Sequence, residues 1–112
     1  MQTFPPAASG PLAGLAPHHA FTTRASRFRG DTEAADLAAL AQHLGVTPDR
    51  LVRVSQVHGR RVLVVGADAP PPAGVEADAI VCTDPSLAVV VRVADCVPIL
   101  LADRRHRVVA VS

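Results

Sequence analysis

The sequence predicts an α/β (α+β) fold, in which a largely antiparallel or mixed β-sheet is layered with helices. Two observations favour this class. An apolar stripe with helical spacing lies within residues 31–44, and a series of short apolar runs bounded by turn residues follows it as far as residue 111. Apolar residues spaced by three and four indicate a helix, whereas short runs rich in Val and Ile between Gly, Pro and Asp indicate strands.

The helical stripe and the segment before it form the first part of this pattern. The stripe has its apolar residues at i, i+3, i+4 and i+7: Leu37, Leu40, Ala41 and Leu44. We expect one helix from Asp31 to Leu44, with Asp31 or Thr32 as N-cap and Gly45 just beyond its end. Before the helix, residues 18–23 are expected to form a short first strand, and residues 1–17, rich in Pro, Ala and Gly, a poorly ordered lead-in.

The strands of the sheet are expected after the helix. The run Leu51–His58 reads as a half-buried strand, and Gly59 with Arg60 predicts a reversal into a second strand, Arg61–Val65, which would complete a hairpin. The Pro-rich stretch 66–74 is expected to be a loop. Four further strands are predicted, at residues 79–83, 88–94, 98–102 and 108–111.

Composition limits the classes of partner. The chain has 112 residues, of which 49% are hydrophobic and 3% aromatic, and its formal net charge is +1. A nearly neutral chain without Trp or Tyr is a poor candidate for nucleic-acid binding, which uses basic surfaces and aromatic stacking. The apolar runs fall short of the roughly 20 residues of a membrane span, and the N-terminus has no secretory pattern. We expect a cytoplasmic protein, with no nucleic-acid or membrane partner, whose oligomeric state the sequence leaves open.

The first candidate site lies at the end of the run Leu51–His58. Side chains of a strand alternate between faces, so Gln56 and His58 share a face with Val52 and Val54. Burying an amide or an imidazole without a partner costs about 1–3 kcal/mol. These two polar side chains are therefore expected either to be paired or to line a wet cavity.

The second candidate site interrupts a long apolar run. Asp95 and Cys96 precede Pro98, which cannot donate to a strand ladder and so predicts a strand end or bulge there. A thiol at such an edge could bind metal or act as a nucleophile, and it could equally be an inert small hydrophobe. Cys82, within an apolar run, fits the inert alternative better, and we expect both thiols to be free.

A metal site does not follow from spacing alone. His58 and Cys96 match no short zinc motif, and catalytic zinc usually takes three protein ligands. His106 is a poor third candidate because its arginine neighbours disfavour a cation. The adjacent His18 and His19 would point to opposite faces of a strand, and His43 lies beside the helical stripe, so none of the three is placed in the site.

Three strings together resemble one known family. They are SQVHG at residues 55–59, EADAIVCTDPSLAVVVRVADCVPILLAD at residues 76–103, and VVAVS at residues 108–112. In combination they are similar to the multicopper polyphenol oxidase, or laccase-domain, family, whose members are regarded as purine nucleoside phosphorylases with adenosine deaminase activity. The resemblance covers about residues 51–112.

The resemblance implies a zinc site and its ligands. It carries two zinc ligands onto His58 of QVHG and Cys96 of ADCVP. The third ligand in the family is the His of a HAGWRG motif, which is expected directly after VVAVS, where this sequence stops at Ser112. We therefore expect residues 18–112 to be the incomplete N-terminal half of a larger single domain.

The resemblance also implies the chemistry and leaves alternatives. The implied reactions are phosphorolysis of adenosine, inosine, guanosine or methylthioadenosine and hydrolytic deamination of adenosine, with purine nucleoside and phosphate as partners. Asp95 and Gln56 are the expected catalytic residues, and Arg92 is a weaker candidate for binding phosphate. The alternatives are a copper-dependent polyphenol oxidase and a catalytically inactive fragment.

Overall fold

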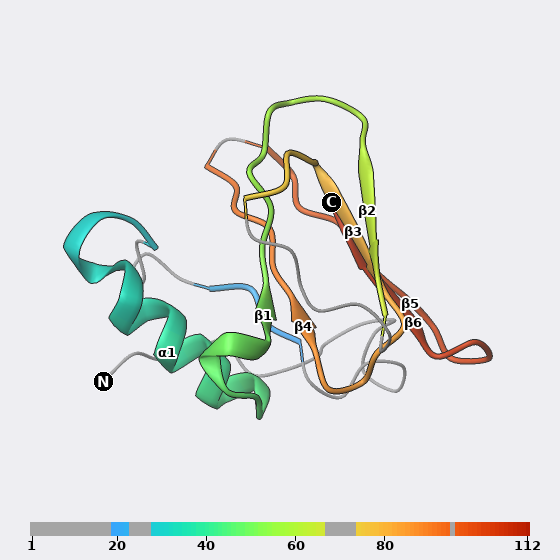
Figure 1. Ribbon diagram of the computed structural model, residues 1–112, viewed down its shortest axis with the longest axis horizontal. Helices are drawn as coiled ribbons and strands as arrows, with labels where there is room; N and C mark the ends of the chain where they lie inside the picture. Colours follow the sequence, from blue (N-terminus) through green and yellow to red (C-terminus); the bar gives the residue numbers. More distant parts are fainter. Residues whose placement is uncertain (1–18, 23–27, 67–73, 95) are drawn as a thin grey trace.

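A computed structural model describes residues 19–22, 28–66, 74–94 and 96–112 of the chain. It contains one α-helix, two short 3₁₀ turns and six strands in the described ranges (Figure 1). The helical elements are η1 (Gly30–Thr32), α1 (Glu33–Leu44) and η2 (Pro48–Arg50). The strands are β1 (Leu51–Val52), β2 (Val62–Val65), β3 (Ala79–Cys82), β4 (Ala88–Val89), β5 (Leu100–Asp103) and β6 (Val108–Val111). Mixed strand pairing together with a helix confirms the predicted α/β class.

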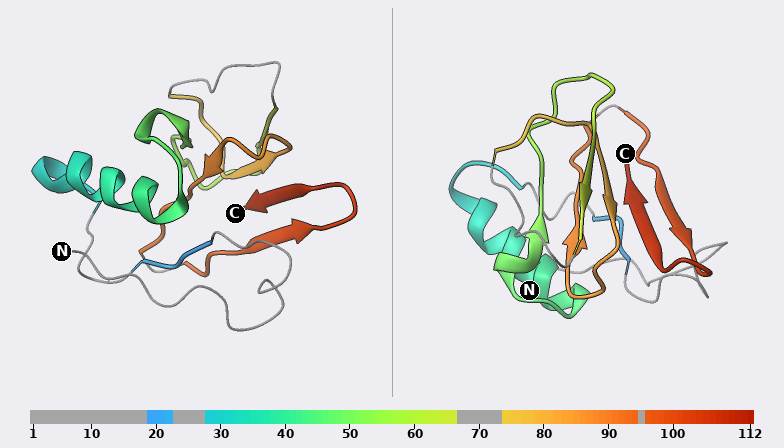
Figure 2. Two further views of the ribbon diagram at one scale, coloured as in Figure 1. Left: turned by 90° about the horizontal axis from the view of Figure 1, so that it is seen from below. Right: turned by 45° about the vertical axis from the view of Figure 1, so that its right-hand side comes forward.

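The strands form two separate sheets. β1 pairs in parallel with β4, and the larger sheet has the order β2-β3-β6-β5, in which β2 and β3 are parallel and β6 is antiparallel to both of its neighbours. In Figure 1, and again in the right-hand view of Figure 2, β1 and β4 lie between α1 and the larger sheet. The molecule therefore has a helix on one side, a small parallel pair in the middle and a four-stranded sheet on the other side.

The predicted hairpin of residues 51–58 with residues 61–65 is wrong. β1 and β2 belong to different sheets, and each pairs in parallel with a strand from much later in the chain. Between them the chain is held by the later segment 75–77, because the Ser55 N–H donates to the Val75 carbonyl at 2.8 Å and the Ala77 N–H donates to the Ser55 carbonyl at 3.1 Å. Long-range pairing thus replaces the local reversal that Gly59 and Arg60 suggested.

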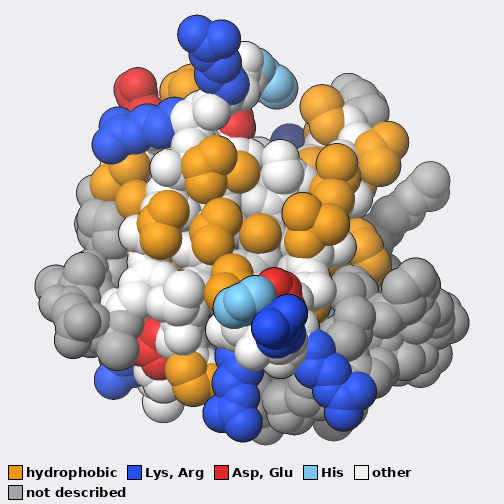
Figure 3. Space-filling model, turned by 90° about the vertical axis from the view of Figure 1, so that its right-hand side faces the viewer, with side chains coloured by type: hydrophobic (Ala, Val, Ile, Leu, Met, Phe, Trp, Pro, Cys, Tyr) orange, Lys and Arg blue, Asp and Glu red, His pale blue; other side chains and the backbone are white. Residues whose placement is uncertain are grey.

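The hydrophobic core lies between the β1–β4 pair and the inner face of the larger sheet. Its buried members are Val52, Val65, Ile80, Cys82, Leu87 and Val111. Successive residues of a strand point to opposite faces, so β2 buries Val65 and exposes Val62 and Val64. Figure 3 views the molecule from the right-hand side of Figure 1 and shows the apolar side chains that remain at the surface there. Each fully buried aliphatic side chain contributes roughly 1.5–3 kcal/mol relative to exposure.

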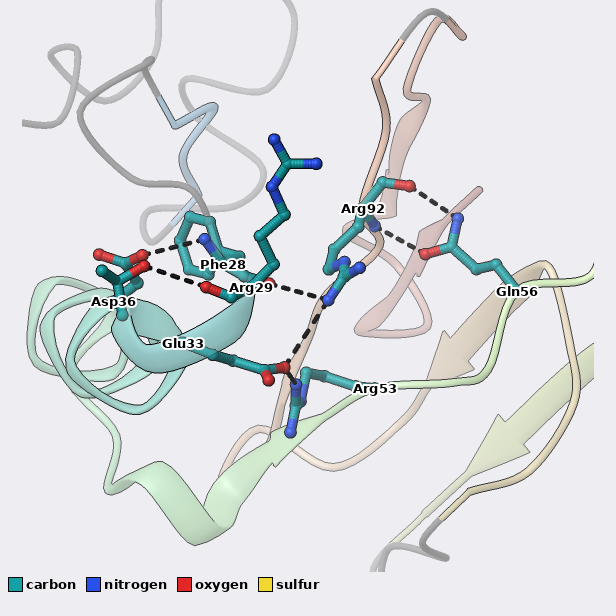
Figure 4. Close-up of polar contacts among 8 residues, drawn as sticks. Phe28, Arg29, Glu33, Asp36, Arg53, Gln56 and Arg92 are labelled. Carbon is teal, nitrogen blue, oxygen red and sulfur yellow. Dashed lines mark hydrogen bonds and ion pairs between the residues drawn. The ribbon is translucent and has the colours of Figure 1, made fainter.

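The helix forms nearly where the sequence predicts it. α1 begins at Glu33, two residues after Asp31, because residues 30–32 form a 3₁₀ turn first. Thr32 occupies the N-cap position without a side-chain cap bond, and Gly45 ends the helix in the left-handed conformation with φ 77°. Its buried face includes Asp36, whose carboxylate accepts the Phe28 N–H at 2.9 Å (Figure 4). No helix in the described ranges is long and apolar enough to cross a membrane.

Several strands begin or end at other residues than predicted. β6 forms as predicted, β3 ends one residue early, at Cys82, and β5 begins two residues late, at Leu100, and ends one residue late, at Asp103. The strand predicted at residues 88–94 is regular only at Ala88–Val89. No strand forms at residues 19–22, and the remainder of the predicted strand at 18–23 lies outside the described residues, as do residues 1–17 and 67–73.

Candidate functional site

A cavity of about 880 Å³ opens beside the turn that follows β1. Eight of the residues that line it carry polar or reactive side chains: Arg53, Ser55, Gln56, His58, Asp78, Arg92, Cys96 and Ser112. The structure therefore brings His58, Cys96 and Gln56 to one cavity, which we call the His58–Cys96 cavity. Asp95 lies outside the described residues.

His58 is held in an unusual backbone conformation. Its φ is 58°, in the left-handed region, which costs a residue with a side chain roughly 1–2 kcal/mol. His58 is exposed and its backbone has left the strand that the alternating pattern predicted. The imidazole thus stands on a turn at the edge of the cavity.

Asp78 stabilises that turn through its carboxylate. The N–H groups of Val57, His58 and Gly59 all donate to it, at 3.0, 2.9 and 2.8 Å. The bond from the Gly59 N–H, together with those from His58 and Val57, holds the pKa of Asp78 below its usual value. Sequence analysis missed Asp78. An aspartate before a strand is a weak signal, and nothing local indicates that it reaches a turn about 20 residues earlier.

Gln56 uses its side chain as a strand partner. Its Nε2 donates to the Arg92 carbonyl and its Oε1 accepts the Arg92 N–H, both at 2.8 Å (Figure 4). The Gln56 amide therefore takes the place of a strand partner for the Arg92 main chain, and β4 does not continue past Val89 as a regular strand. Since an amide has two N–H groups and two lone pairs, one donor and one acceptor site of Gln56 remain for a ligand. The half-buried Gln56 is thus paired and lines the cavity as well.

The two cysteines are both free and lie in different environments. Cys96 is exposed and lines the His58–Cys96 cavity. Cys82 is 2% exposed in the core, and its thiol donates to the Asp84 carbonyl at 3.3 Å. Burial raises the pKa of the Cys82 thiol, so it stays protonated and unreactive at neutral pH. The prediction of free thiols is confirmed.

Two arginines bring positive charge to the cavity. Glu33, in the first turn of α1, accepts a bond from Arg53 Nη1 at 2.7 Å and lies 3.7 Å from Arg92 Nη1 (Figure 4). Arg92 Nη1 also donates to the Phe28 carbonyl at 2.8 Å. Since two guanidinium groups share one carboxylate, this cluster keeps one positive charge in excess.

The donor types at the cavity fit zinc, but their number is short. Imidazole and thiolate are ligands that zinc and copper both accept. Within the described ranges, no group of three or more His, Cys, Asp and Glu side chains is arranged to hold a metal ion. His106 does not line the cavity, and its Nδ1 lies 2.7 Å from Asp103 Oδ2. His43 is exposed on α1, and His18 lies outside the described residues.

Fold and cavity together define a mixed α/β domain whose cavity carries imidazole, thiol and guanidinium groups. Residues 19–112 match the family described as multi-copper polyphenol oxidoreductase laccase. The chain belongs to this family, which confirms the assignment made from the QVHG and ADCVP strings.

Curated relatives carry a consistent name. Proteins named purine nucleoside phosphorylase match from Streptomyces griseus, with 51% identity over 67 residues, and from Corynebacterium glutamicum, with 43% over 72. A protein of the same name from Deinococcus radiodurans is 38% identical over 113 residues. The matches cover 56%, 63% and 88% of this chain and 26%, 29% and 43% of the respective relatives. The chain therefore spans less than half of the length of these relatives.

Proposed function

We propose that this chain is part of a zinc-dependent purine nucleoside phosphorylase, and that His58 and Cys96 are two of its zinc ligands. One observation carries the proposal. An imidazole and a thiol that are 38 positions apart in the sequence (96 − 58) line the same cavity. The names of the relatives support the reaction class.

The third zinc ligand is proposed to come from further polypeptide. The described residues contribute two donors, and catalytic zinc commonly takes three protein ligands and a water. A histidine following residue 112, in a HAGWRG motif like that of the family, would complete the set. Zinc bound there would supply a Lewis acid that polarises water or a phosphate oxygen.

The residues of this chain have separate tasks in the proposed phosphorolysis. Arg53 and Arg92, which share Glu33, present guanidinium donors that would bind and orient phosphate. Gln56 presents one free donor and one free acceptor to the nucleoside while it holds the main chain of Arg92. Asp95 is proposed as the acid that protonates the leaving purine, since glycosidic cleavage needs a proton at the base.

The substrates follow from the same proposal. We propose adenosine, inosine, guanosine and methylthioadenosine, each with phosphate, and the hydrolytic deamination of adenosine in the same cavity. The cytoplasm supplies both kinds of substrate and is the proposed location.

Two other readings make different predictions. The family description names copper and polyphenols, and thiolate with imidazole also suits copper. With only two donors in the described ranges, the isolated 112-residue chain could also be inactive. Oxygen uptake with a phenol, measured on protein loaded with copper alone or zinc alone, distinguishes the oxidase from the phosphorylase.

Zinc binding by the 112-residue chain tests the proposed ligands. We expect weak or substoichiometric zinc that is lost in His58→Ala and in Cys96→Ser, with Cys82→Ser as the matched control that retains it. Metal analysis after gel filtration gives the stoichiometry, and phosphate-dependent release of hypoxanthine from inosine tests the reaction on the longest protein that the gene encodes. Zinc binding that survives Cys96→Ser would contradict the ligand assignment. Tight binding of one zinc would show that this chain supplies the third ligand itself.

A further inference from the structure

The turn that carries His58 cannot hold its conformation by local bonds alone. Residues 57–59 present three successive N–H groups toward one side, and the middle residue has a left-handed φ although it is not glycine. Successive N–H groups that converge in this way form a concave anion-binding nest. Without an anion, the three N–H groups would have no shared acceptor, and no hydrogen bonds would offset the energetic cost of the left-handed φ of His58.

Asp78 is the anion of this nest, and it is itself firmly anchored. Its N–H donates to the Arg61 carbonyl at 3.1 Å, and its carbonyl accepts the Ser112 hydroxyl at 3.4 Å. The next residue, Ala79, begins β3, which lies at the centre of the core. Asp78 therefore connects the His58 turn rigidly to the larger sheet.

Asp78 also lines the His58–Cys96 cavity, so the turn and its anchor face the same space. Both carboxylate oxygens are engaged, since Oδ1 accepts the N–H groups of Val57 and His58 and Oδ2 accepts that of Gly59. This role differs from that of a metal ligand, for which a carboxylate oxygen must be available to the metal. The carboxylate acts on the backbone and, through it, on the direction of the imidazole.

We infer that Asp78 is a positioning residue, which fixes the His58 turn so that the imidazole faces the cavity in the orientation needed to bind metal. The inference rests on the proposed function, because it assumes that His58 is a zinc ligand. Groups that orient metal ligands from the second layer typically affect metal affinity about 10–100-fold.

The test compares Asp78→Asn with Asp103→Asn in the 112-residue chain. Asp103 is the matched control, because its carboxylate also accepts main-chain N–H groups, from Arg105 and His106, at a turn that does not line the cavity. An asparagine at position 78 has a single acceptor oxygen and turns an N–H₂ group toward the third donor. We expect about 10-fold or greater loss of zinc affinity in Asp78→Asn and less than 2-fold in Asp103→Asn, measured by competition with a chromophoric chelator.

A second readout needs no metal and separates the inference from the proposed function. In NMR spectra of the zinc-free chain, we expect the amide resonances of Val57, His58 and Gly59 to shift in Asp78→Asn while those of α1 stay in place. Unchanged amide resonances of these three residues would overturn the inference, as would zinc affinity within 2-fold of the parent chain. If the parent chain bound no zinc through His58, the proposed function would fail, and the amide resonances would still decide whether Asp78 holds the turn. If Asp78→Asn unfolded, Asp78→Glu, which moves the charge by one methylene, would be compared in the same two measurements.

Discussion

The two thiols of this chain show how strongly burial changes the reactivity of chemically identical groups. Cys82 packs inside the core with its thiol bonded to a carbonyl, whereas Cys96 lies in the open at the cavity. Thiolate is the reactive form, so exposure and pKa together determine the rate of alkylation.

Alkylation therefore distinguishes the two residues. With iodoacetamide at pH 7.5 we expect modification of Cys96 in the native chain, and modification of Cys82 at least about tenfold more slowly, because its pKa is raised and reagent reaches it only through unfolding. Peptide mass mapping after a timed reaction measures both rates. Equal rates in the native chain would contradict the burial of Cys82, whereas in urea, where both thiols are exposed, similar rates are expected.

The residues of the site were predictable to the extent that their signals were local. The apolar face that ends in Gln56 and His58 indicated pairing or a wet cavity; the Gln56 amide is paired, and both residues line the His58–Cys96 cavity. Asp78 was not predictable, because its partners lie 19 to 21 positions earlier in the chain. The role of Gln56 as a partner for the Arg92 main chain spans 36 positions and was hidden for the same reason.

Among the elements, the β5–β6 hairpin depends on one carboxylate. Asp103 accepts the N–H groups of Arg105 and His106, and its Oδ2 lies 2.7 Å from His106 Nδ1. The bond from the His106 side chain, followed by those from the main chain, lowers the pKa of Asp103. Arg107 closes this turn with a φ of 55°.

The lowered pKa of Asp103 makes the hairpin acid-sensitive. A carboxyl whose pKa is lower in the folded state stabilises the fold above the ordinary aspartate value of about 3.9, and this contribution is lost as pH falls through the lower folded value. We expect Asp103→Asn to be less stable than the parent chain at pH 6 and the difference to shrink below about pH 4. Urea midpoints at several pH values measure this. A difference that grew toward acid would contradict the sign.

The helix and the strand pairing differed in how well local pattern predicted them. α1 has its own apolar stripe and a terminal Gly45, so its position follows from nearby residues. The β1 and β2 pairings are parallel and long-range, and the short Gly59–Arg60 signal for a hairpin was overridden by bonds from Asp78 and the segment 75–77. A hairpin has a turn signal directly after its first strand, whereas a parallel partner far along the chain gives no sequence signal next to the strand that it pairs with.

At the scale of the whole molecule, one face of the larger sheet is packed and the other is open. Ile80 is fully buried, whereas Val64 in the neighbouring strand is 67% exposed and Leu101 at the sheet edge is 61% exposed. The register places Val64, Val81, Ala110 and Leu101 in one row across this open face.

The two faces should respond very differently to truncation. Ile80→Ala should lower the free energy of unfolding by about 2–5 kcal/mol, because it leaves a cavity in the core. Val64→Ala is the control on the open face and should change it by less than about 0.5 kcal/mol. Chemical denaturation of the purified chains compares them. Similar losses in both variants would mean that the open face is covered in solution.

The three bonds to Asp78 also set an order of events during folding. A ribosome releases residues 57–59 before it releases residue 78, so the imidazole-bearing turn is synthesised first and cannot settle until the later carboxylate arrives. The orientation of this ring therefore waits for residue 78, and anything that delays docking of β3 leaves the ring free to point elsewhere.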